Sequence, residues 1–122
     1  MAGQNTYLES DGRAVAVTLS STVEKNQVVY VQGWLGIANR DGANGSTITL
    51  SVERREYQFT VPAALTVNKG DTVYVDITDL TGHIPDDSAY YTASGANRVP
   101  LFKATAAKDA ANVVTGILLA GI

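Results

Sequence analysis

The stretch that decides the fold reads Val28-Val29-Tyr30-Val31-Gln32-Gly33-Trp34-Leu35-Gly36-Ile37-Ala38. A second stretch of the same kind reads Lys69-Gly70-Asp71-Thr72-Val73-Tyr74-Val75-Asp76. In both, glycine stands beside aromatic and β-branched residues, which favour extended strands, while glycine adopts the backbone angles that tight turns need. Neither stretch contains a nucleophile beside a base or a cluster of metal ligands. Together they predict a compact β-domain that functions through its surfaces.

Alternation of apolar and polar residues predicts further strands on both sides of these stretches. Residues 13–19, 47–52 and 57–61 each place their apolar side chains on one face, which is the pattern of a half-buried strand. Two final strands are predicted over residues 99–106 and 112–120, and turns rich in Gly, Asn and Asp separate the strands. The prediction is an all-β, single-domain antiparallel sandwich or barrel of about seven or more short strands, with a jelly roll among the arrangements.

The common phase of these apolar residues predicts one shared hydrophobic core. Its expected members are Val15, Val17, Leu19, Ile48, Leu50, Val52, Phe59, Val73, Val75, Ile77, Ile117 and Leu119.

The composition limits the number of domains and the kinds of partner. The chain has 122 residues, a length typical of one domain, and we expect residues 1–10 to form an N-terminal arm ahead of a domain spanning 11–122. Its formal net charge is −3 and it has no basic stripe of the kind that binds nucleic acid. Its apolar run over residues 113–122 is far shorter than the ~20 residues of a membrane-spanning helix. We therefore expect neither a nucleic-acid nor a membrane partner.

Candidate reaction centres are poorly supported by the sequence. The sole histidine, His83, stands near Asp86 and Asp87 without a serine or cysteine in a nucleophile context, so we interpret it as an exposed loop residue. These two aspartates and the preceding Asp76 and Asp79 form an acidic set, which lacks the spacing of a calcium-binding loop. We predict a protein without enzymatic activity, cofactor or bound metal.

Three aromatic residues are candidates for contact with a partner. Trp34 is the single tryptophan, and it fits either a core anchor or an exposed interface anchor, because tryptophan is frequent among binding hot spots. Tyr90 and Tyr91 are adjacent in a predicted polar loop that runs to Asn97, where they fit either partner contact or simple loop packing.

The glycine-flanked stretch over residues 28–38 and the Gly-Asp-x-Val-Tyr-x-Asp motif over residues 70–76 resemble a known family. It is the family of small cement, or head decoration, proteins of tailed bacteriophages, formerly a domain of unknown function. The resemblance implies a non-enzymatic structural protein, made in the bacterial host cytoplasm, that binds the outside of the expanded icosahedral head. There it would cement neighbouring major capsid protein subunits against the pressure of the packaged DNA.

The resemblance also implies self-association, with a trimer favoured and a dimer as the alternative. We expect the capsid and oligomer interface to involve Gln4, Asn5, Tyr7, Leu8, Trp34, Tyr90 and Tyr91. The alternative function is a carbohydrate- or receptor-binding β-module of a virion or cell surface. In that case Trp34, Tyr90 and Tyr91 would form a sugar platform, with Asp86 and Asp87 as hydrogen-bond acceptors.

Overall fold

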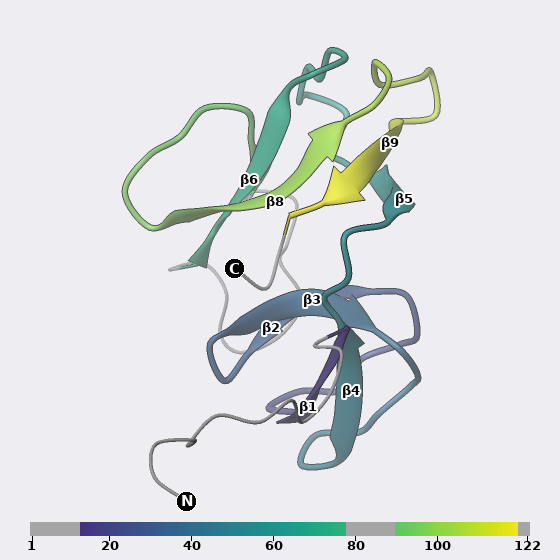
Figure 1. Cartoon of the computed structure of the whole chain (residues 1–122), viewed down its shortest axis with the longest axis vertical. Coiled ribbons are helices and arrows are strands. Elements are labelled where there is room, and N and C mark those ends of the chain that lie inside the picture. Colours follow the sequence, from purple (N-terminus) through teal and green to yellow (C-terminus); the bar gives the residue numbers. More distant parts are fainter. Residues whose placement is uncertain (1–12, 78–89, 120–122) are drawn as a thin grey trace, which may run out of the picture.

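Two antiparallel sheets, one from each half of the chain, form the protein (Figure 1). The structure is a computed structural model that describes residues 13–77 and 90–119. These residues contain nine strands and no α-helix, which confirms the all-β prediction. Of the predicted arrangements, the open sandwich of two sheets is the one observed.

The N-terminal half builds a four-stranded sheet in the order β1-β4-β3-β2. Its strands are β1 (Ala14–Thr18), β2 (Val28–Val31), β3 (Trp34–Ala38) and β4 (Thr47–Ser51). This order is that of a Greek key, because β2, β3 and β4 are sequential neighbours while β1 lies beside β4. Thr18 N–H, at the end of β1, donates a 2.9 Å hydrogen bond to Oε1 of Gln32 and so links β1 to the turn that follows β2.

A two-residue turn joins β2 to β3 and fixes the most regular hairpin of this sheet. Gln32 and Gly33 have φ angles of 52° and 81°, and positive φ at both positions is the geometry that matches the twist of a hairpin. The four residues of β2 pair in register with β3, from Val31 opposite Trp34 to Val28 opposite Ile37.

The C-terminal half builds a five-stranded sheet in the order β5-β9-β8-β6-β7. Its strands are β5 (Glu56–Thr60), β6 (Thr72–Asp76), β7 (Tyr90–Tyr91), β8 (Arg98–Ala104) and β9 (Val113–Leu118). The β6–β8 register shifts so that Val73 faces Phe102 while Tyr74 faces Pro100, which leaves Leu101 as an extra residue. Such a bulge redirects side chains, and both Leu101 and Phe102 are fully buried.

The interior contains two hydrophobic clusters, so the prediction of one shared core is wrong. The larger cluster is made of Leu35, Ile37, Phe59, Val61, Val67, Val73, Val75, Leu101, Phe102, Ala104, Val114 and Leu118. The smaller cluster is made of Val17, Leu19, Val23, Val29, Val31, Ala38, Ile48 and Leu50. The β2–β3 hairpin separates them, because Leu35 and Ile37 pack in the larger cluster while Val29 and Val31 pack in the smaller one. In Figure 1, β2 and β3 lie on the side of the four-stranded sheet that is nearer the five-stranded sheet.

The final strand has the opposite phase to the one predicted. Val114 and Leu118 are fully buried, whereas Ile117 and Leu119 are only partly buried. Gly116 belongs to the buried set, and a Cβ atom there would lie 2.3 Å from Cδ2 of Phe102. The absence of a side chain at this position therefore lets the Phe102 ring pack on the inner face of β9. Three other predicted core residues, Val15, Val52 and Ile77, are also only partly buried.

Candidate interaction site

Trp34 is an exposed aromatic residue on a hairpin that is packed on both faces. It is the first residue of β3, and it retains 38% of its accessible surface while Leu35 and Ile37 retain 3% and 6%. The preceding turn and the β2 register hold its backbone, and the clusters on both faces of the hairpin prevent it from moving as a loop would. The indole is therefore partly exposed at the start of β3 and is not a core anchor.

Tyr90 and Tyr91 form a short edge strand, so the prediction that they lie in a loop is wrong. Tyr91 pairs with Tyr74 and Tyr90 pairs with Val75, which places β7 at the edge of the five-stranded sheet. Both tyrosines are half-buried, and Tyr90 packs against the larger hydrophobic cluster. Because Trp34 belongs to the other sheet, the three aromatic candidates are divided between two sheets.

Arg98 is a neighbour of Tyr91 that no pattern in the sequence predicts. Its guanidinium carbon lies 3.5 Å from the centroid of the Tyr91 ring, a cation–π geometry, and Nη1 donates a 3.0 Å hydrogen bond to the Ala93 carbonyl. One face of the Tyr91 ring is therefore covered by Arg98.

The remaining predicted site residues lie outside the described part of the chain. They are Gln4, Asn5, Tyr7 and Leu8 of the predicted arm and His83, Asp79, Asp86 and Asp87 of the loop before β7. Asp76, at the end of β6, is the one member of the acidic set that is described. Among the described residues, no three histidine, cysteine or carboxylate side chains gather where they could hold a metal ion.

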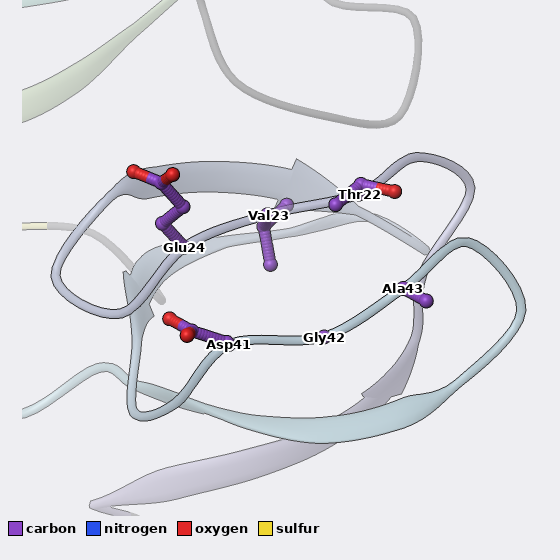
Figure 2. A pocket seen from close by; sticks show the side chains of 6 residues that line it. All are labelled: Thr22, Val23, Glu24, Asp41, Gly42 and Ala43. Atoms are coloured by element: carbon purple, nitrogen blue, oxygen red, sulfur yellow. The ribbon is translucent and has the colours of Figure 1, made fainter.

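An open hollow of 410 Å³ lies beside the β1–β2 connection. Figure 2 shows the six residues that line it. Glu24 and Asp41 bring carboxylates to it, but the Glu24 carboxylate lies on the far side of its own segment from Asp41. Asp41 Oδ1 accepts a 2.8 Å hydrogen bond from the Lys25 amide. The hollow therefore holds two separated carboxylates, one of which stabilises the loop.

The described residues thus present exposed strand and hairpin surfaces, which is typical of a structural or binding β-module. Within residues 13–77 and 90–119 there is no helix with the length and hydrophobicity needed to cross a bilayer.

Comparison with known families identifies the class of module. The sequence model of the phage cement proteins matches residues 9–120, nearly the whole chain. The chain belongs to the phage cement protein family and is a structural component of the phage capsid. No curated protein and no solved structure matches it.

Proposed function

We propose that this protein binds the outer surface of the expanded phage head and cements neighbouring major capsid protein subunits against the pressure of the packaged DNA. The observation that carries the proposal, beside family membership, is the exposed Trp34 on a hairpin buried on both faces. An anchor that is rigid before binding loses little conformational entropy when it is covered.

The proposed attachment uses several weak contacts at once. Trp34 supplies one contact, β7 with Tyr90 and Tyr91 supplies a second, and the N-terminal arm supplies a third. We propose that copies also associate with one another around a symmetry axis of the head, as a trimer, with a dimer as the alternative. Contacts that are modest singly then give strong attachment, because each bound copy raises the effective concentration of the remaining contacts.

Replacing Trp34 with alanine tests the main anchor. We expect binding to expanded empty heads to weaken by about 2 kcal/mol, roughly thirtyfold, as truncation of a central tryptophan does at other interfaces. Binding is measured by sedimentation of the heads with increasing amounts of protein. Gln58→Ala changes an exposed residue of β5 and serves as the control. Unchanged binding by a folded Trp34→Ala variant would remove the hairpin from the interface.

Deletion of residues 2–8 tests the arm, in which Gln4 and Asn5 precede the apolar pair Tyr7 and Leu8. We propose that the arm adds a strand to a sheet edge of a neighbouring subunit on the capsid, so that its backbone donates hydrogen bonds there. The truncated protein is then expected to lose head binding while its thermal midpoint stays unchanged. Full binding by the truncated protein would contradict the role of the arm.

A further inference from the structure

The five-stranded sheet has an outer face, which points away from the larger hydrophobic cluster. Lys103 of β8 and Ile117 of β9 are register partners on this face, while Phe102 and Leu118 lie on the inner face. A groove of 470 Å³ opens on the outer face. Strands β8 and β9, which contribute Lys103 and Ile117, are each paired with a neighbouring strand on both sides. The groove is therefore formed before any partner binds.

The floor of this groove is apolar where a solvent-facing strand would be polar. Val114 and Leu118 cover the inner face of β9, yet the row on its outer face is apolar at every position except Thr115; this row consists of Val113, Thr115 and Ile117, followed by Leu119 just beyond the strand. A strand with one solvated face alternates apolar and polar residues, whereas a continuous apolar run is typical of a strand covered on both faces. Within the described residues, the four-stranded sheet packs on the inner face and leaves the outer row without a second layer.

The rim of the groove is positively charged. Lys69 and Lys103 line it and are both exposed, and no carboxylate contributes to the lining. Neither lysine forms an ion pair with a described residue. The chain has a formal net charge of −3, so two ammonium groups beside an apolar floor make the local charge at this groove opposite in sign to that of the whole chain. The groove therefore complements a ligand that is apolar and acidic.

We propose that this groove binds an extended segment of a neighbouring capsid protein that combines an apolar side chain with a carboxylate. The apolar side chain covers Ile117 and Leu119, and the carboxylate pairs with Lys69 and Lys103. Glu56 of β5 is the register partner of Ile117, and its negative charge repels a carboxylate on that side of the groove. The carboxylate of the partner segment is therefore favoured on the opposite side, beside Lys69 and Lys103. The volume suits one or two side chains rather than a helix. The inference rests on the proposed capsid-binding role and gives that role a second surface.

Charge reversal at the rim tests the groove on the full chain. Lys69→Glu with Lys103→Glu is compared with Lys25→Glu and Arg54→Glu, which are exposed residues outside the groove. Both double variants lower the net charge equally, so a general effect of charge cancels. We expect the groove variant to bind expanded empty heads about tenfold more weakly and with a smaller salt dependence, as changes of rim charge do. The control variant is expected to bind as the wild type does.

Equal binding by the two double variants would contradict the proposed role of the groove in capsid binding, while the proposed function of the protein would stand. Failure of the wild-type protein to bind heads would instead overturn the proposed function. Zero-length carbodiimide crosslinking of decorated heads then identifies the occupant. We expect Lys69 or Lys103 to be joined to an aspartate or glutamate of a capsid protein. Crosslinks formed only between copies of this chain would overturn the proposed occupant.

Discussion

Replacing Phe102 with alanine is expected to lower the free energy of unfolding by about 3–5 kcal/mol, because the change removes a large buried ring and leaves a cavity. Phe102 is fully buried and stacks on Phe59, with ring centroids 4.0 Å apart and planes inclined by 4°. Its ring also packs against the bare backbone of Gly116. Equilibrium unfolding in urea, followed by Trp34 fluorescence and circular dichroism, measures the loss.

Lys103→Ala is the control for Phe102→Ala, since it changes the next residue of β8 on the exposed outer face. We expect this control to stay within about 0.5 kcal/mol of the wild type, as most surface substitutions do. If Phe102→Ala cost no more than the control, Phe102 could not be the centre of the larger cluster.

Replacing Leu50 with alanine is expected to cost about 2–5 kcal/mol, the range for buried leucines. Leu50 has no accessible surface and packs in the smaller cluster with Val17 and Ile48. Leu50→Ala tests the smaller cluster and Phe102→Ala tests the larger one, and the β2–β3 hairpin lies between the two clusters. The same urea titration measures it. Thr47→Ala, an exposed residue of β4, is the control, and a cost near zero for Leu50→Ala would place this face of β4 in solvent.

The candidate site could be predicted in part from the sequence. Trp34 was identified as a candidate, but its exposure depends on its place at the start of β3, just after the hairpin turn. The contact between Tyr91 and Arg98 was not predictable, because it requires β7 to pair with β6 and the following turn to return the chain. A strand of two residues, such as β7, has no detectable alternation.

Local patterns of the sequence determined the strand positions, since alternation and turn residues act over a few neighbours. Strands β4 and β6 lie where alternation predicted them, and β2 and β3 lie within the glycine-flanked stretch over residues 28–38 that predicted short strands there. The family assignment also follows from the sequence, through the order of motifs along the chain.

Tertiary structure alone decided which face of β9 is buried and how many cores exist. Apolar residues occupy both phases of β9, so its pattern is compatible with either orientation, and the choice depends on the fit of Phe102 against Gly116 from the neighbouring strand. The β2–β3 hairpin is likewise apolar on both faces, and only the packing of a sheet on each side divides the interior in two. These choices depend on contacts between residues far apart in the chain, which no local periodicity encodes.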